Sequence, residues 1–359
     1  MSYCLKFFCT FLIFSLFFLS CDFNIPNSNS SKPTSIGDMS RILVLSDSAV
    51  FASPAGQSLS DIFEKNYPAL NQAEPYFSLM DIRYFSFNKL LKRSKIVLVL
   101  CDINRDSRLS NYMRNNLGKE RLTLMKEKEG FYLNFIENEW AKPQLLILCA
   151  GLDESSLQNG IEKYKSLLFT KVTSFEEKEM EKKYAQIRGL NDHQKSIEQK
   201  FNLDLKIPSD YKKTLDGDSF LCFTKEIENG YMCISFYQSD YKDTLQFSTK
   251  ELIKKRNIVL KNHLKGELEN TYIKTEERFP TLTETIPVDS SYSKRLRGLW
   301  RMANDFMGGP FINQNIHIAQ THKIVHIDGL VYSPGKAKKK YIKEIECLFS
   351  GIKIKQNDL

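Results

Sequence analysis

The sequence predicts two domains of mixed secondary structure: an α/β domain over residues 41–173 and an α+β domain with an antiparallel sheet over residues 201–359. In the first, short apolar runs typical of buried strands alternate with helical patterns, which favours a sheet covered by helices. In the second, apolar residues recur with a period of two, as in strands that bury one face. The length of 359 residues also exceeds that of a typical single domain.

The first domain is predicted from four strand segments and two helical segments. Strands are expected at residues 42–45, 77–85, 94–102 and 144–150, and helices at residues 58–65 and 155–169. The alternation does not decide between parallel and antiparallel strands. A charged helical stretch follows at residues 174–200, where Ser174 and Glu177 form a capping box. This stretch either links the two domains or packs as an extra helix on the first domain.

The second domain begins with an alternating apolar pattern from Phe201 to Ile207. A hairpin over residues 220–237 is expected to turn at Asn229-Gly230, a dipeptide typical of two-residue loops. The remaining elements are helices near 250–264 and 338–350 and strands near 270–277, 296–303, 311–319 and 323–332. This order resembles the Mog1/PsbP-like fold, an antiparallel sheet between helices, which by itself implies no chemistry.

Composition and charge limit the classes of protein to which the chain can belong. With 42% apolar and 26% charged residues, it is expected to build packed cores, which excludes a wholly disordered, collagen-like or multi-span membrane protein. The net charge of +8 is spread along the chain and fits a Lys-rich composition with a weak preference for anionic surfaces. The sequence contains no DNA- or RNA-binding motif, so no nucleic-acid partner is expected.

The N-terminal residues predict export and a lipid anchor. Residues 7–19 form an uncharged, mostly apolar run of 13 residues, which is shorter than the roughly 20 residues of a membrane-spanning helix but fits a secretory signal. The run ends in Leu19-Ser20-Cys21, which resembles the lipobox of bacterial lipoproteins. That resemblance implies cleavage after Ser20 and a lipid on the Cys21 sulfur. A plain signal peptide and an uncleaved anchor are the alternatives.

The lipobox divides the N-terminal region into two segments. Residues 1–20 are expected to be a signal peptide, and the lipid on Cys21 would hold the mature chain on a bacterial membrane, at the outer membrane or another periplasmic face. Residues 21–40 are rich in Asn, Ser and Pro and contain few apolar side chains. Such a segment cannot bury enough surface to fold, so we expect a disordered tether.

Five cysteines lie beyond the lipobox, and none predicts a metal or cofactor site. Two of them end apolar strand runs, where a free thiol acts as a small apolar side chain. With a loop at Asn229-Gly230, Cys222 and Cys233 lie two pairs apart along the hairpin, with their sulfurs about 13 Å apart. No disulfide is therefore expected between them. Cysteine and histidine spacing typical of zinc sites is absent, and no cofactor is expected.

Three C-terminal motifs have both a structural and a functional interpretation. The Gly-Gly-Pro sequence at 308–310 predicts a sharp turn into the next strand, or alternatively glycines that admit a ligand to the backbone. Trp300 is expected in the core, or otherwise in a binding groove. The basic run Lys338–Lys340 at the start of the last helix predicts a solvated face, with contact to anionic lipid head groups as the alternative.

A group of polar residues on one predicted hairpin is the weak candidate site. If the loop centres on residues 321–322, His317 lies opposite His326 and Asn315 lies opposite Asp328, all on one face of the sheet. Imidazoles and a carboxylate gathered in this way can bind a metal ion. A polar, solvated sheet face is the more common outcome, so no metal ligand is assigned.

The C-terminal motifs resemble the signature of a family named for domain of unknown function 4837, which consists of lipoproteins of the Bacteroidetes group. The matching motifs are Gly298–Trp300, Asp305–Phe311, Asp328–Gly335, Ile207-Pro208, Lys255-Arg256 and Trp140–Gln144. The resemblance extends over roughly residues 40–350. It implies a lipoprotein, in agreement with the lipobox, but the family has no established activity to carry over.

The sequence does not contain the catalytic motifs GxSxG, HExxH, GxxxxGK or GxGxxG. This lowers the expectation of an enzyme without excluding one, and no catalytic residue is assigned. We expect an envelope-anchored, non-catalytic binding or assembly module that presents its sheet or a groove to an envelope protein partner or a ligand. The alternative is a hydrolase or metal-dependent enzyme that uses His317, His326 and Asp328.

Overall fold

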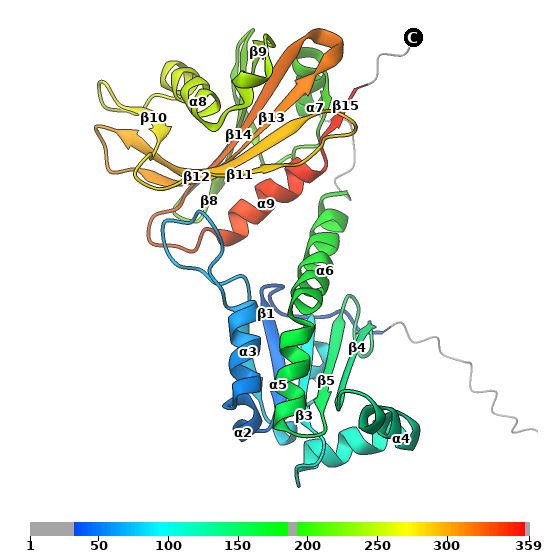
Figure 1. Ribbon diagram of the computed structural model, residues 1–359. Helices are drawn as coiled ribbons and strands as arrows, with labels where there is room; N and C mark the ends of the chain where they lie inside the picture. Colours follow the sequence, from blue (N-terminus) through cyan, green and yellow to red (C-terminus); the bar gives the residue numbers. More distant parts are fainter. Residues whose placement is uncertain (1–31, 186–191, 356–359) are drawn as a thin grey trace, which may run out of the picture.

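The computed structural model describes residues 32–185 and 192–355. The predicted signal peptide, Cys21 and most of the predicted tether lie outside these residues. Two sheets, each covered by helices, form two domains joined by the helix α6 (Lys165–Ala185), which runs from one domain toward the other (Figure 1). Within the described residues, no helix is both long and apolar enough to span a membrane.

The sheet of the first domain is mostly parallel, with the strand order β2-β1-β3-β5-β4. Strands β1 (Arg41–Ser46), β2 (Ser78–Ile82), β3 (Ile96–Asp102) and β5 (Leu145–Gly151) run parallel, and each overlaps a predicted strand. The edge strand β4 (Phe131–Glu137) pairs antiparallel with β5 and was not predicted. The sequence left the strand direction open, and the pairing shows a parallel sheet with one antiparallel edge.

Helices cover both faces of this sheet. The short α2 (Ser48–Phe51) is followed by α3 (Pro54–Phe63), which packs beside α5 (Glu154–Lys163) on one face. Apolar residues of α4 (Arg108–Glu127) pack on the other face. Inside α4, Gly118 has a left-handed φ of 74°, so the helix breaks into two pieces at this residue.

The end of the predicted tether is part of the first domain. Thr34 and Ile36 make isolated parallel bridges to Lys142 and Ser94, and Ser35 is buried. The Ser35 amide donates to the Lys142 carbonyl at 3.1 Å. The expected boundary at residue 40 is therefore too late, because these backbone hydrogen bonds fix the chain from about Pro33 onward.

The predicted linking helix is two helices, α6 and α7 (Asp192–Phe201), and the residues between them lie outside the described part of the chain. Ser174 lies in the interior of α6, so the predicted capping box is wrong. Side chains at the start of α6, such as Val172, pack in the core of the first domain, whereas Glu176 contacts Lys343 of the second domain. Helix α6 therefore fulfils both interpretations, as a packed helix and as a link.

The second domain is built on an antiparallel sheet with the strand order β10-β12-β13-β14-β9-β8-β7, and β11 pairs with β12. Two residues of the predicted strand from Phe201 to Ile207 form the short β6 (Leu203–Asp204), which pairs with β15 (Lys353–Ile354), while Phe201 ends α7. The sheet strands are β7 (Lys212–Asp216), β8 (Phe220–Ile227), β9 (Gly230–Asp240), β10 (Tyr272–Thr275), β11 (Leu282–Thr285), β12 (Ser293–Ala303), β13 (Gly308–Ile318) and β14 (Lys323–Tyr332).

This sheet is also sandwiched between helices. Apolar side chains of α9 (Lys339–Ser350) and α7 pack on one face with Ile316 and Ile327. Helix α8 (Thr249–His263) covers the other face, where its Leu252 and Leu260 meet the buried Trp300. The structure thus confirms the predicted fold class, an α/β domain followed by an α+β domain with an antiparallel sheet.

The predicted separation of Cys222 and Cys233 is wrong. Ile227 pairs with Gly230, so the hairpin loop is Glu228-Asn229 and the register differs by two residues from the prediction. The two sulfurs lie 2.8 Å apart, and both side chains are buried. Both thiols are free in the structure, but distance no longer argues against a disulfide.

The segment Gly308-Gly309-Pro310 lies within β13 and does not form the predicted turn. A Cβ atom on Gly309 would lie 2.1 Å from the Val331 carbonyl oxygen. The indole Nε1 of Trp300 donates to that same carbonyl at 3.1 Å. Glycine is therefore required because another strand's backbone approaches closely, not because the chain reverses here.

Candidate functional site

The predicted polar residues share a face of the β13–β14 hairpin, but with a different pairing. Ile318 pairs with Lys323, which leaves a four-residue loop at 319–322. As a result, His326 lies opposite Asn315, and Asp328 lies opposite Asn313. The predicted pairs of His317 with His326 and of Asn315 with Asp328 are wrong by two residues.

The face that carries these residues is not solvated. Asn315 and Asp328 are fully buried beneath α8, and His326 is 2% exposed. Burial of a carboxylate requires a charged partner, and α8 supplies the fully buried Arg256. The Asp328 carboxylate accepts from Arg256 Nε at 2.6 Å and from Nη2 at 3.0 Å. The predicted solvated sheet face is therefore wrong, because Arg256 neutralises the acid inside the domain.

The buried ion pair is completed by neighbouring polar groups. Arg256 Nη1 donates to Thr275 Oγ1 at 3.0 Å, and the Asn313 amide donates to Asp328 at 3.1 Å. The guanidinium also lies over the Phe311 ring, 3.8 Å from its centroid. Because Arg256 and Asn313 already bind the Asp328 carboxylate, it is not free to act as a metal ligand.

Both nitrogens of His326 also have partners. Nδ1 lies 2.7 Å from Asn315 Oδ1, and Nε2 lies 3.0 Å from Ser239 Oγ. Burial lowers the pKa of His326 to about 3, so the imidazole is neutral at ordinary pH. His317 lies apart, with its ring 4.1 Å from that of Tyr241. In the part of the chain that the structure describes, no three His, Cys, Asp or Glu residues are placed to hold a metal ion.

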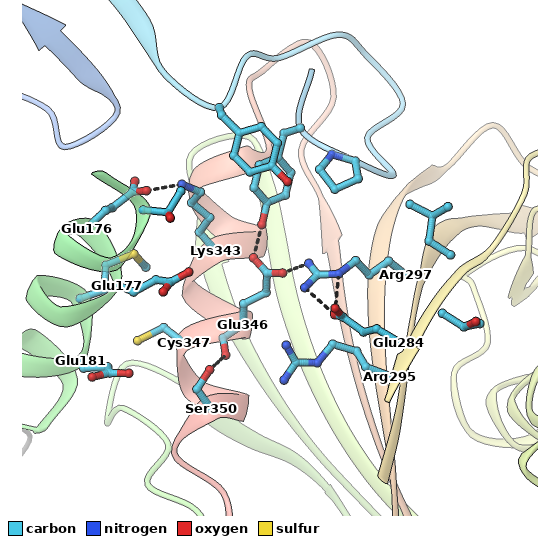
Figure 2. Close-up of a pocket in the computed structure, with 17 residues that line it drawn as sticks. Glu176, Glu177, Glu181, Glu284, Arg295, Arg297, Lys343, Glu346, Cys347 and Ser350 are labelled. Carbon is cyan, nitrogen blue, oxygen red and sulfur yellow. Dashed lines mark hydrogen bonds and ion pairs between the residues drawn. The ribbon is translucent and has the colours of Figure 1, made fainter. Parts of the chain in front are cut away.

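A second candidate, which the sequence analysis missed, is a pocket of about 430 Å³ between the two domains. Figure 2 shows α6 on one side, β11 and β12 on the other, and α9 between them. The residues that line it come from separate segments between Tyr67 and Ser350, so no single local motif could reveal it. Its lining includes Tyr67, Tyr76, Glu176, Glu177, Met180, Glu181, Glu284, Arg295, Arg297, Lys343, Glu346, Cys347 and Ser350.

A loop of the first domain holds α9 in place beside this pocket. The Glu74 carboxylate accepts the backbone N–H groups of Lys338 and Lys339 at 2.7 and 2.9 Å. It thus caps the N-terminus of α9, where unpaired N–H groups favour a negative charge. Lys339 Nζ in turn donates to the Tyr76 carbonyl at 2.9 Å. The predicted solvated face is wrong for Lys338 and Lys339, which are buried at the domain junction.

Most charges in the pocket are paired with one another. Arg297 binds Glu284 at 3.0 Å and contacts Glu346, which also accepts a hydrogen bond from the Tyr67 hydroxyl. Lys343 of α9 pairs with Glu176 of α6, so this ion pair joins the two domains. Burial raises the pKa of Glu176, although Lys343 opposes the shift.

Arg295 is the cation of the pocket that no carboxylate pairs. Its Nε donates to Gln314 Oε1 at 2.6 Å, and no ion pair involves it among the described residues. Its side chain is 6% exposed, and burial lowers its pKa to about 10, below the usual range of arginine. In Figure 2 the guanidinium extends from β12 toward the pocket.

Two carboxylates face the pocket from the opposite side. Glu177 and Glu181 lie one turn apart on α6, and neither has an ion-pair partner among the described residues. The sequence offered one clue to this site, since Arg295 and Arg297 occupy alternate positions of a strand and therefore share a face. The acids gave no such clue, because charged residues are ordinary on a helix.

The pocket chemistry suits binding better than nucleophilic catalysis. Cys347 is the thiol in its lining, and burial raises its pKa to about 11. A reactive thiolate needs a lowered pKa and a nearby base or cation. The described pocket lining contains no histidine that could act as this base.

We predict that removing one partner of the buried ion pair strongly destabilises the second domain. Asp328→Asn leaves Arg256 buried without a counter-charge, which should lower the free energy of unfolding by about 3–5 kcal/mol. Combining it with Arg256→Met should cost less than the sum of the two single changes. Urea denaturation tests this, with Lys163→Met at an exposed ion pair as the control. A loss no larger than that of the control would contradict the prediction.

The lowered pKa of His326 predicts acid sensitivity. The unfolded chain binds a proton at this residue below pH 6.5, whereas the folded chain does so only near pH 3. The stability contribution of His326 is therefore complete above pH 6.5 and falls by up to about 1.4 kcal/mol per pH unit below it. His326→Gln should flatten the pH dependence of the unfolding free energy between pH 6.5 and 5. Equal slopes in both proteins would show that His326 is not buried as a neutral group.

Comparison with known proteins assigns each domain to a separate family model. Residues 190–351 match the model described as Domain of unknown function (DUF4837), and residues 35–188 match Domain of unknown function (DUF8532). The expected resemblance over residues 40–350 was therefore too broad, and Trp140–Gln144 lie in the part matched by the second model.

No curated protein matches the chain. Among solved structures, the Ran-binding protein Mog1p of Saccharomyces cerevisiae is 8% identical and covers 43% of this chain and 91% of its own, with a TM-score of 0.29. A mutant of Mog1 is also 8% identical, covers 44% and 92%, and has the same TM-score of 0.29. Scores this low carry no argument about fold or function. Residues 190–351, which span the second domain, are thus similar to the domain of unknown function DUF4837, the family that the C-terminal motifs resemble.

Proposed function

We propose that this protein is a lipoprotein of the bacterial envelope that binds a ligand or protein partner in the pocket between its domains. The N-terminal run of 13 residues that ends in Leu19-Ser20-Cys21 supports the anchor. A lipid on Cys21 would hold the protein on the outer membrane or another periplasmic face. The family resemblance agrees with this interpretation but gives no activity.

The pocket is the observation that carries the binding proposal. Small-molecule sites are typically concave, measure about 300–1,000 Å³ and often lie between domains. This pocket measures about 430 Å³ and is lined from both domains. Its walls carry the Arg295 guanidinium and the Glu177 and Glu181 carboxylates, none of which has an ion-pair partner within the described chain, and such groups can select a ligand by charge.

The enzyme alternative has less support than the binding proposal. The residues it would use do not converge, since Asp328 pairs with Arg256, His326 is bonded on both nitrogens and His317 lies apart. A hydrolase would need other residues; among the described residues that line the pocket, Cys347 is not activated, because burial raises its pKa to about 11, and no histidine lies beside it.

The anchor proposal predicts that Cys21→Ala abolishes metabolic labelling with a fatty acid. The change removes the thiol to which the lipid would attach. Cys9→Ala, which lies within the predicted signal, is the matched control and should keep its label. Labelling of Cys21→Ala at the level of the unchanged protein would contradict a lipid at this position.

The binding proposal predicts that a pocket variant loses its partner in cells. The tagged protein is crosslinked in the envelope, and bound proteins and small molecules are identified by mass spectrometry. Arg295→Gln should reduce the captured partner at least tenfold, because the exposed part of its guanidinium faces the pocket. Arg108→Gln, an exposed arginine at the start of α4, is the control. Equal capture by both variants would place the binding surface elsewhere.

A further inference from the structure

Most of the charged side chains in the pocket form ion pairs with one another, and the ones that do not define what a ligand could bring. Arg297 is neutralised by Glu284 and Glu346, and Lys343 is neutralised by Glu176. Among the described residues, what remains is the Arg295 guanidinium on β12 and the Glu177 and Glu181 carboxylates on α6, on opposite sides of α9 (Figure 2). A ligand that completes this pattern must carry an anionic group at one end and a cationic group at the other.

Arg295 is built to receive the anionic group. Its side chain is 6% exposed, and Gln314 fixes its Nε at 2.6 Å. Gln314 is itself held by a hydrogen bond to Ser293. This arrangement orients the guanidinium and leaves its terminal nitrogens toward the pocket. A fixed guanidinium binds a carboxylate with two parallel hydrogen bonds, a geometry that lysine cannot reproduce.

Glu177 and Glu181 favour the cationic group. At positions i and i+4 of α6 they lie on the same face, where two like charges repel and a cation between them relieves the repulsion. Met180 and the ring of Tyr76 add apolar surface to the pocket lining. An ammonium group is a compact cation that can approach both carboxylates.

We propose that the pocket binds a short peptide with free termini, its carboxylate on Arg295 and its amino group at Glu177 and Glu181. This inference rests on the proposed function of the pocket as a binding site and names the chemistry of its ligand. The charges lie on opposite walls, which favours a peptide over a single amino acid, whose two charged groups are adjacent. The pocket volume of about 430 Å³ limits the ligand to a small molecule.

The test uses the full-length protein in detergent and a mixture of tripeptides with randomised side chains. A ligand that binds the folded state raises the melting temperature as its concentration increases. We expect free tripeptides to raise the melting temperature, and N-acetylated or C-amidated mixtures to need at least tenfold higher concentrations. Arg108→Gln should bind like the unchanged protein.

Variants assign each end of the peptide. Arg295→Gln should bind the free and the C-amidated mixtures equally, and Arg295→Lys should restore only part of the difference while it keeps the charge. The double variant Glu177→Gln/Glu181→Gln, which changes exposed residues, should bind the free and the N-acetylated mixtures equally. Unchanged preferences in these variants would overturn the assignment.

Two further outcomes separate this inference from the proposed function. If blocked and free tripeptides act equally, or if none binds while the crosslinked partner still depends on Arg295, the peptide inference fails and the pocket remains a binding site. If no tripeptide binds and the partner is also independent of Arg295, both the inference and the proposed function fail.

Discussion

The Glu74 carboxylate caps helix α9 from another domain, and the arrangement of the two domains depends on this interaction. It accepts the backbone N–H groups of Lys338 and Lys339, which begin the helix. No side chain of the helix's own N-terminal residue makes this hydrogen bond. Because the helix macrodipole and the free N–H groups both favour an anion here, the contact joins the domains with a defined geometry.

The pocket follows from this joint. Once the N-terminus of α9 is fixed, its next turns bring Lys343 to Glu176 of α6 and Glu346 to Tyr67 of the first domain. Helix α9 also buries its apolar face against the second sheet, so it belongs to that domain's core. Helix α9 thus packs on the second domain and is capped by the first. As a result, the two charged walls of the pocket, one on α6 and one on β12, lie opposite each other.

Much of the fold is encoded locally and was predicted from the sequence. The segments at residues 42–45 and 94–102 contain short apolar runs rich in β-branched side chains, which favour buried strands over helices, and they form β1 and β3. The residues predicted to pair across the two hairpins were wrong, because the length of the loop sets the register and the sequence did not define that length. A two-residue shift preserves which face a side chain occupies, so the shared face of His326 and Asp328 was right while their partners were wrong.

The charged residues were the hardest to place from the sequence. Lys338, Lys339 and Arg256 look like solvated charges in a Lys-rich chain, yet each is buried with a partner from a distant segment. Glu74 precedes Lys338 by 264 residues, so no local pattern could predict their contact. The pocket has the same origin, since tertiary packing alone brings Glu177 and Arg295 to opposite walls.

Hydrogen exchange in the first turn of α9 tests this account most directly. In Glu74→Ala, the amides of Lys338 and Lys339 lose their acceptor, so exchange should accelerate there and in the part of α6 around Glu176. Glu129→Ala, which removes an exposed ion pair with Lys163, should leave both segments unchanged. If Glu74→Ala exchanges like the unchanged protein in both segments, the cap does not hold the domains together and the account of the pocket is wrong.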